Sequence, residues 1–182
     1  QYSPSYIRNR ISFIKNQMLS EMELDKFFNT PIDKIVVDVY YKYNERLIAS
    51  AAVDFDDLLL MPVRLFEHNK EILEHYQERY KYILIDEYQD TNPIQERLIH
   101  FIKQGGCNLC IVGDDDQTIY QFRGSDPENI LTFRERYGIN KYIVLGTDYR
   151  SSEAIVDIGK RVIVNNAKRL PKIMESGKLV KY

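Results

Sequence analysis

A short aliphatic run that ends in two adjacent carboxylates constrains this chain more than any other feature. The run Ile83–Ile85 is followed directly by Asp86 and Glu87, and polar residues continue as far as Asn92. An apolar segment of this length between polar neighbours predicts a buried strand of a parallel sheet. In open α/β sheets, ligands bind just beyond the carboxyl ends of the strands. We therefore expect Asp86 and Glu87 at the edge of a ligand site.

The chain from residue 82 onward alternates between strand and helix patterns. Helices are expected to begin after good N-cap residues such as Asn92, and Gly105-Gly106 marks a helix end. Strands are predicted at 82–85, 109–112 and 142–145, and helices at 93–103, 127–136 and 151–166, with one short helical turn at 117–120. This order predicts parallel strands joined by right-handed crossovers, and hence an α/β fold with helices flanking the sheet.

The first 80 residues are predicted to be helical. Thr30-Pro31 is a typical helix start, with Thr30 as the cap and proline in the first turn. Helices are expected over 6–23, over 32–52, from 54 onward with Pro62 as a kink or break, and over 70–79, with a connector at 25–30. The β-branched cluster at 35–39 also allows a strand. Asp54, Asp56 and Asp57 are interpreted as helix-start charges, and one solvated basic face is expected on the first helix, formed by Arg8, Arg10 and Lys15.

Composition limits the function classes. The net charge of −2 over 182 residues gives no overall basic signature, so any contact with nucleic acid must be local. Neither a signal peptide nor an apolar run of membrane length is present, so a cytoplasmic protein is expected. Cys107 and Cys110 have no second cysteine pair that would complete a zinc site, and we interpret them as strand residues. Both ends look like cuts within a longer protein.

A second polar loop follows the second predicted strand. Gly113 and three successive aspartates, Asp114 to Asp116, precede Gln117. An Asp at a strand end can hold Mg²⁺, and a neighbouring Glu can orient a water molecule that attacks a phosphate. A calcium loop of the EF-hand type is excluded, because Ile119 and Ser125 stand where that loop needs Gly and Glu. Two adjacent strand ends with these side chains predict a phosphate-and-metal crevice.

Four spaced segments resemble successive motifs of UvrD/Rep/PcrA-like superfamily 1 DNA helicases. In order, they span residues 53–59, 86–92, 112–125 and 148–152. The resemblance extends from about residue 53 to 169 and implies part of a RecA-like P-loop NTPase sheet. It further implies a division into a helical insert segment (1–50), the C-terminal part of a first motor domain (51–146) and the start of a second motor domain (147–182).

The resemblance implies roles for five residues around ATP. Asp86 would hold Mg²⁺ and Glu87 would be the general base for the attacking water. Gln117 would contact the γ-phosphate or that water, and Tyr149 would pack near the adenine. Arg150 would reach the γ-phosphate from the second motor domain, and its planar guanidinium suits phosphate oxygens.

The same resemblance implies a contact with single-stranded DNA. Tyr120, Phe122 and Arg123 would face the strand. Aromatic side chains beside an arginine suit this contact, because base stacking contributes about 1–3 kcal/mol per base without sequence preference. Duplex DNA is the expected second partner, as the substrate of unwinding.

The chain departs from the family pattern in three places. The phosphate-binding loop G-x-x-x-x-G-K-[ST] is absent from these residues, and in the family it would precede residue 1. The chain alone is therefore expected to bind ATP weakly, to hydrolyse it hardly at all, and to have an incomplete sheet with one poorly covered face. Asp148 replaces an asparagine that is more usual before Tyr-Arg-Ser, and Phe122 replaces a tryptophan.

Three functions remain open at this stage. The first is a segment of an ATP-dependent DNA helicase. The second is a degenerate relative that binds single-stranded DNA or a partner without hydrolysis. The third is a metal-dependent nuclease that uses Asp86, Glu87 and Asp114.

Overall fold

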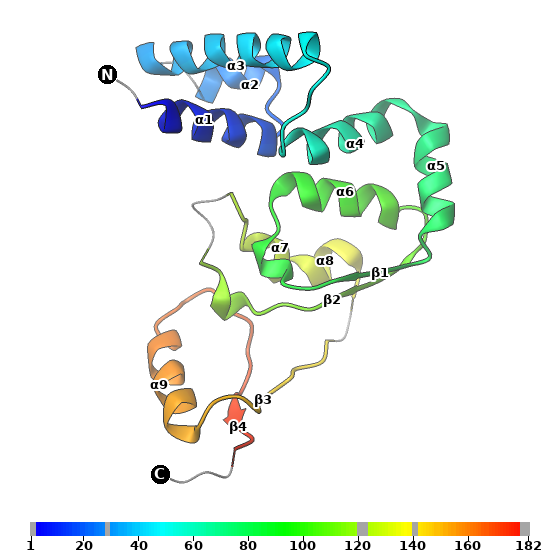
Figure 1. The fold of residues 1–182 in the computed structure, drawn as a ribbon. Coiled ribbons are helices and arrows are strands. Elements are labelled where there is room, and N and C mark those ends of the chain that lie inside the picture. The colour runs from blue at the N-terminus through cyan, green and yellow to red at the C-terminus, as the bar shows by residue number, and fades with distance from the viewer. Residues whose placement is uncertain (1–2, 28–29, 120–123, 140–141, 179–182) are drawn as a thin grey trace.

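The computed structural model describes residues 3–27, 30–119, 124–139 and 142–178. Three helices form one end of the molecule, a two-stranded sheet with its helices lies in the middle, and a small part with α9 forms the other end (Figure 1). The first part contains α1 (Pro4–Asn16), α2 (Glu21–Phe27) and α3 (Pro31–Ala49). The middle contains α4 (Asp57–His68), α5 (Lys70–Arg79), β1 (Tyr82–Ile85), η1 (Tyr88–Asp90), α6 (Pro93–Lys103), β2 (Asn108–Ile111), η2 (Asp115–Gln117), α7 (Glu128–Leu131) and α8 (Phe133–Tyr137). The last part contains β3 (Thr147–Asp148), α9 (Glu153–Ile163) and β4 (Glu175–Ser176).

The prediction of one helix over 6–23 is wrong. Helix α1 ends at Asn16, and Met18 adopts a left-handed conformation with φ of 52°. Ser20 then begins α2, because its backbone N–H and its hydroxyl both donate to the carboxylate of Glu23. This Ser-x-x-Glu arrangement is a typical helix start. Part of the predicted connector at 25–30 is consequently helical.

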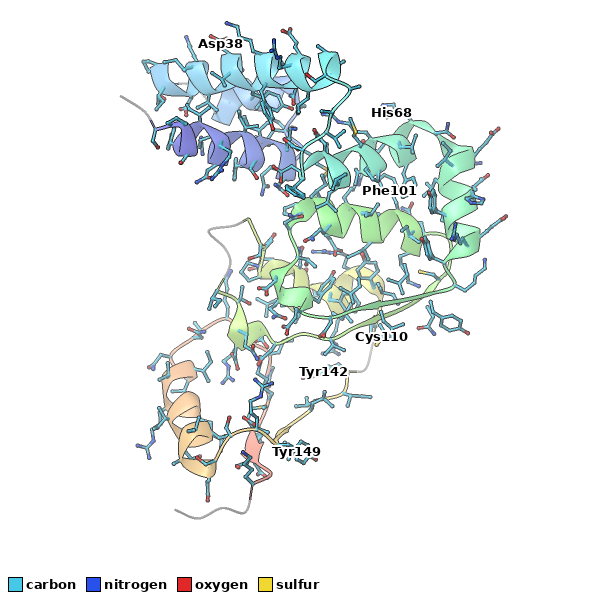
Figure 2. All side chains as sticks on the ribbon, in the orientation of Figure 1. Asp38, His68, Phe101, Cys110, Tyr142 and Tyr149 are labelled. Atoms are coloured by element: carbon cyan, nitrogen blue, oxygen red, sulfur yellow. The ribbon has the colours of Figure 1, made fainter. Side chains whose placement is uncertain are left out.

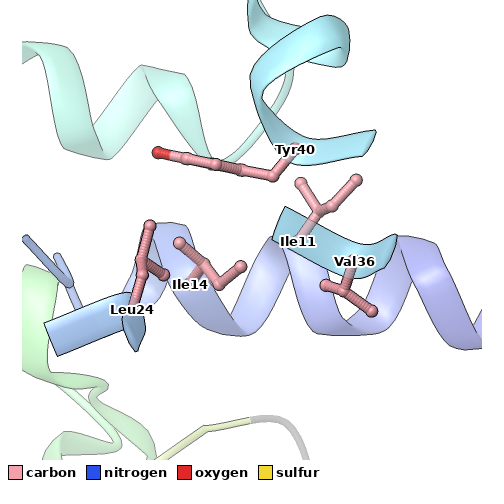
Figure 3. Close-up of a cluster of buried hydrophobic side chains, with 5 residues drawn as sticks. All are labelled: Ile11, Ile14, Leu24, Val36 and Tyr40. Atoms are coloured by element: carbon pink, nitrogen blue, oxygen red, sulfur yellow. The ribbon is translucent and has the colours of Figure 1, made fainter. Parts of the chain in front are cut away.

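The start of α3 confirms the prediction from Thr30-Pro31. The Thr30 hydroxyl accepts the Asp33 N–H, and Asp33 accepts the Thr30 N–H in return. Helix α3 continues through residues 35–39, so the strand alternative is wrong. The core of this part contains Ile11, Ile14, Leu24, Val36 and Tyr40, which meet between α1, α2 and α3 (Figure 3).

Lys15 does not belong to a solvated basic face, as predicted, but is only 1% exposed. Its ammonium donates to Asp54 Oδ2 and to Asp57 Oδ1, both at 2.8 Å. Burial by itself would lower the pKa of Lys15, but the hydrogen bonds that its ammonium donates to the two carboxylates outweigh burial and raise that pKa. Asp54, just before α4, and Asp57, its first residue, thus do more than provide helix-start charge, since they fasten α1 to α4. Helix α4 itself begins at Asp57 rather than 54, and Pro62 lies within it without splitting it.

Replacing Lys15 with methionine should lower the free energy of unfolding by about 2–4 kcal/mol, because two partly buried carboxylates lose their cation. Arg8→Met is the matched control, since Arg8 lies exposed on the same helix, and a change within about 0.5 kcal/mol is expected. Urea unfolding of the chain, followed by circular dichroism, measures both. Equal stability of Lys15→Met and wild type would contradict the inferred importance of this ion pair.

Strands β1 and β2 confirm two predicted strands and their parallel pairing. They pair from Tyr82 opposite Asn108 to Ile85 opposite Ile111. One face is covered by a cluster of Tyr88, Ile130 and Phe133, against which the inward residues of both strands pack. Helix α6 lies on this side of the sheet (Figure 1). Its cap at Asn92 and its end at Lys103 are as predicted, and Gln95 completes a capping box with Asn92.

The opposite face of this sheet is open. Tyr82 is 74% exposed and Leu84 is 79% exposed, so the prediction of a strand buried on both faces is wrong for β1. Cys110 also lies exposed on this open side (Figure 2). Cys107, just before β2, is buried, and both cysteines are free thiols. The expected poorly covered face is therefore confirmed.

The predicted third strand at 142–145 is wrong. Within the described residues this segment is extended but has no strand partner, and its four side chains are exposed. It leads away from β1 and β2 toward the part that contains α9, and Tyr142 lies along it (Figure 2). There β3 pairs in parallel with β4. The described fold is a mixed one with two small parallel sheets, and a larger RecA-like sheet is not present in it.

Three shorter predictions need correction. The helix expected at 127–136 is divided into α7 and α8 at Thr132, whose hydroxyl donates to the Glu128 carbonyl. The short helical turn expected to begin at residue 117 is η2, and it begins two residues earlier, at Asp115. The helix expected at 151–166 is α9, which is shorter at both ends. No helix among the described residues is long and apolar enough to cross a bilayer.

Candidate functional site

A cavity of about 660 Å³ is lined by residues of both the middle part and the α9 part. It collects side chains from the end of β1, from the loop after β2 and from the turn between β3 and α9. Its lining residues are Glu87, Gln117, Thr147, Asp148, Tyr149, Arg150, Ser151 and Met174. Four residues predicted for nucleotide chemistry thus share one cavity, namely Glu87, Gln117, Tyr149 and Arg150. Asp86 is exposed beside Glu87, but it is not among the lining residues.

The backbone at Glu87 presents its side chain to the cavity. Glu87 has φ of 51° and ψ of 42°, a left-handed conformation that non-glycine residues rarely adopt. Asp86 Oδ1 accepts the Glu87 N–H at 2.9 Å and supports this turn. The next residue, Tyr88, is fully buried. The sharp turn therefore separates an exposed carboxylate from an adjacent core residue, and strain of this kind is frequent at functional sites.

A buried polar network includes Tyr88, the residue that follows Glu87 in this turn. The hydroxyls of Tyr88 and Tyr137 both donate to the carboxylate of Glu96, and Arg136 pairs with the same carboxylate. Burial and the contact with Glu96 raise the pKa of both tyrosines, so both hydroxyls remain protonated donors. No sequence pattern indicated this network, because its members lie up to 49 positions apart.

Gln89 is a second residue that the sequence did not single out. It is 1% exposed, and its side-chain amide donates to Glu87 Oε2 at 2.7 Å. The amide oxygen accepts the Asp114 N–H at 2.9 Å. Gln89 thus connects the end of β1 with the loop after β2. The residue order over 86–90 can be read from the sequence, but the direction of each side chain cannot.

The aspartate loop after β2 is fastened to the segment after α9. Lys172 contacts all three aspartates, 114 to 116. Arg169 forms a two-bond fork with Asp116, at 3.0 Å from Nε and 2.5 Å from Nη2. Burial would raise the pKa of Asp114, but the hydrogen bond from Lys172 lowers it below its ordinary value. These contacts hold the loop that carries Gln117 against the α9 part.

The turn before α9 is organised by Asp148. Its Oδ1 accepts the N–H of Ser151 at 2.9 Å and the N–H of Arg150 at 2.7 Å. These backbone hydrogen bonds, that of Ser151 first, lower the pKa of Asp148. The carboxylate of Asp148, where an asparagine is more usual, therefore interacts with backbone N–H groups of the turn itself. Tyr149 is 78% exposed and projects beside β3 (Figure 2).

The residues predicted to bind DNA, Tyr120, Phe122 and Arg123, lie outside the described residues. Their roles remain predictions.

The carboxylate of Asp86 is a suitable ligand for Mg²⁺. Mg²⁺ in nucleotide sites is usually held by one or two carboxylates together with substrate phosphates and waters. Asp86 is an exposed carboxylate of this kind. The described residues contain no cluster of three His, Cys, Asp or Glu side chains that could hold a metal by itself. Asp114, the further ligand needed for a nuclease, is engaged by Lys172 and by Gln117. The arrangement therefore favours a nucleotide-bound ion over a nuclease site.

Comparison with known proteins agrees with the resemblance read from the motifs. The family model of the UvrD/REP helicase N-terminal domain matches residues 1–138. The ATP-dependent DNA helicase PcrA of Bacillus subtilis (strain 168) is 40% identical over 172 residues, which cover 94% of this chain and 23% of that protein. PcrA of Staphylococcus epidermidis (strain ATCC 35984) is also 40% identical, and PcrA of Staphylococcus aureus (strain Mu50) is 39% identical, each over 94% of this chain and 24% of the relative. The chain thus spans about a quarter of the length of these curated relatives.

Proposed function

The chain belongs to the UvrD/REP helicase family, and on that premise we propose that it is a segment of an ATP-dependent DNA helicase that couples ATP hydrolysis to translocation on single-stranded DNA and to duplex unwinding. The observation that carries the proposal is the shared cavity. Glu87, Gln117, Tyr149 and Arg150 come from three separate segments and line the same space.

The proposed chemistry is attack of water on the γ-phosphate of ATP. Glu87 accepts the proton of the attacking water, and Gln117 orients that water or contacts the γ-phosphate. The guanidinium of Arg150 pairs with phosphate oxygens as negative charge moves toward the leaving group. Asp86 would hold Mg²⁺, and the ion would supply positive charge that stabilises the phosphates of ATP. Positioning and charge stabilisation of this kind are the main sources of rate in phosphoryl transfer.

The proposed DNA contact uses Tyr120, Phe122 and Arg123, in the run that follows Gln117. Because these residues lie within six positions of Gln117 in the sequence, a change at the γ-phosphate could be transmitted from Gln117 to the strand. In the intact protein, residues 1–50 belong to a helical insert, 51–146 complete a first RecA-like motor domain, and 147–182 begin a second one. Ion pairs between the aspartate loop and Lys172 support a site formed between two motor domains.

The test of this function is ATP hydrolysis by the full-length protein with and without single-stranded DNA, together with strand separation of a forked duplex. We expect DNA-stimulated hydrolysis and unwinding that needs both ATP and Mg²⁺. DNA binding without any hydrolysis would overturn the proposal in favour of a binding module.

Replacing Tyr149 with alanine should raise the KM for ATP about 5- to 150-fold, since stacking on a base contributes about 1–3 kcal/mol. Tyr149→Phe keeps the ring and should leave KM near the wild-type value. Steady-state hydrolysis over a range of ATP concentrations measures both variants. An unchanged KM in the alanine variant would remove Tyr149 from the adenine contact.

A further inference from the structure

We propose that Gln89 is a positioning residue that holds the carboxylate of Glu87 in the orientation needed to accept a proton, and that Gly113 provides the space for it. This inference rests on the proposed function, in which Glu87 is the general base. Neither Gln89 nor Gly113 lines the cavity, but each is expected to affect the rate of ATP hydrolysis.

The hydrogen bonds of Gln89 determine which way its amide points. The Asp114 backbone N–H can only donate, so the amide oxygen of Gln89 must face it, at 2.9 Å. The amide nitrogen then faces Glu87 and donates to Oε2 at 2.7 Å. Because Gln89 is 1% exposed, water has little access to replace either bond. One oxygen of Glu87 is thereby held in place, while the side chain still lines the cavity.

Gly113 is required by the same contact. A Cβ at this position would lie 2.7 Å from the Gln89 amide oxygen, 2.9 Å from Ile130 Cδ1 and 3.2 Å from the Tyr88 nitrogen. The Gln89 oxygen and Ile130 Cδ1 both lie closer than 3.0 Å to that Cβ, so both side chains would have to move, and the closer of the two is Gln89. Any larger residue at 113 would therefore push Gln89 away from Asp114.

The contact also connects two residues with different proposed roles. Asp114, whose N–H holds Gln89, accepts the side-chain amide of Gln117 at 2.8 Å. A continuous hydrogen-bonded series thus runs from Glu87 through Gln89 and Asp114 to Gln117. A displacement of Gln117 by the γ-phosphate would reach the general base through this series.

The test uses full-length protein carrying Gln89→Leu, which keeps the approximate size and removes both hydrogen bonds. We expect kcat for ATP hydrolysis to fall about 10- to 100-fold, as is typical when a reacting group is misplaced or loses its outer-shell partner. The affinity for a fluorescent ATP analogue should stay within about 2-fold. Gln77→Leu is the matched control, because Gln77 is a half-buried glutamine that donates to the Phe101 carbonyl away from the cavity.

The split between kcat and ATP binding supplies a readout that a purely structural role would not give. A loss of folding would lower kcat and ATP binding together, whereas a misplaced Glu87 should lower kcat while binding is retained. Gly113→Ala should reproduce the loss of kcat by displacing the Gln89 amide, and it serves as the second variant if a change at Gln89 impairs folding.

The outcomes separate the two proposals. If Glu87→Gln leaves hydrolysis normal, the proposed base is wrong and the function itself must be revised. If Glu87→Gln abolishes hydrolysis while Gln89→Leu and Gly113→Ala keep the wild-type kcat, the positioning role of Gln89 is overturned and the proposed function stands.

Discussion

Replacing Arg150 with alanine in the full-length protein is expected to lower kcat for ATP hydrolysis by about 10³- to 10⁵-fold, the effect typical of an arginine that stabilises phosphoryl transfer. Arg150 lines the cavity opposite the end of β1, and its backbone is held by Asp148. The guanidinium would pair with γ-phosphate oxygens as charge develops there. Single-turnover and steady-state hydrolysis with saturating single-stranded DNA measure the loss.

Two further variants test whether the loss of kcat is due to the guanidinium of Arg150. Arg150→Lys keeps the charge but not the planar fork, so most of the rate should still be lost. Arg161→Ala removes an exposed arginine from α9, which begins just after the Arg150 turn, and should leave kcat unchanged. A kcat within a few-fold of wild type in Arg150→Ala would remove this residue from the reaction.

The second large effect is expected from Glu87→Gln, which should lower kcat by about 10²- to 10⁴-fold, the usual contribution of a general base. The glutamine keeps the size of the side chain but cannot accept the proton. ATP affinity should be retained, because phosphate contacts are made by other residues. Hydrolysis assays and equilibrium binding of a fluorescent ATP analogue separate the two effects.

Glu71→Gln is the control for this variant, since Glu71 is exposed on α5, far along the chain from the cavity residues. The double variant Glu87→Gln/Arg150→Ala gives a further check. Because both groups act on one transition state, the combined loss should be much smaller than the product of the two separate losses. A fully multiplicative loss would indicate that the two residues act in independent steps.

Several elements could be predicted because their signals are local. Thr30-Pro31 and Asn92-Pro93 each carry a cap and a first-turn proline, and both helices begin there. The aliphatic run before Asp86 forms a strand with the predicted bounds, Tyr82–Ile85. A capping residue or a short apolar run acts on its immediate neighbours, so the secondary structure around it depends little on the remainder of the fold.

Other predictions failed where a local pattern had two possible outcomes. Residues 142–145 have strand composition, yet a strand requires a partner that supplies backbone hydrogen bonds, and none of the described residues does so. Lys15 has the sequence context of a solvated lysine, yet two carboxylates about 40 positions away make its burial favourable. Apolar content and charge do not reveal which distant groups will meet.

For the site, the sequence by itself determined the residue types and their order: carboxylates after one strand, a glycine and aspartates after the next, and Tyr149-Arg150 further on. The tertiary structure decided that Glu87, Gln117 and Arg150 line one cavity, that Gln89 donates to Glu87, and that Lys172 pairs with the aspartate loop. The physical reason is range, since caps and strand patterns act over a few residues, whereas hydrogen bonds and ion pairs between segments form only after folding has brought those segments together.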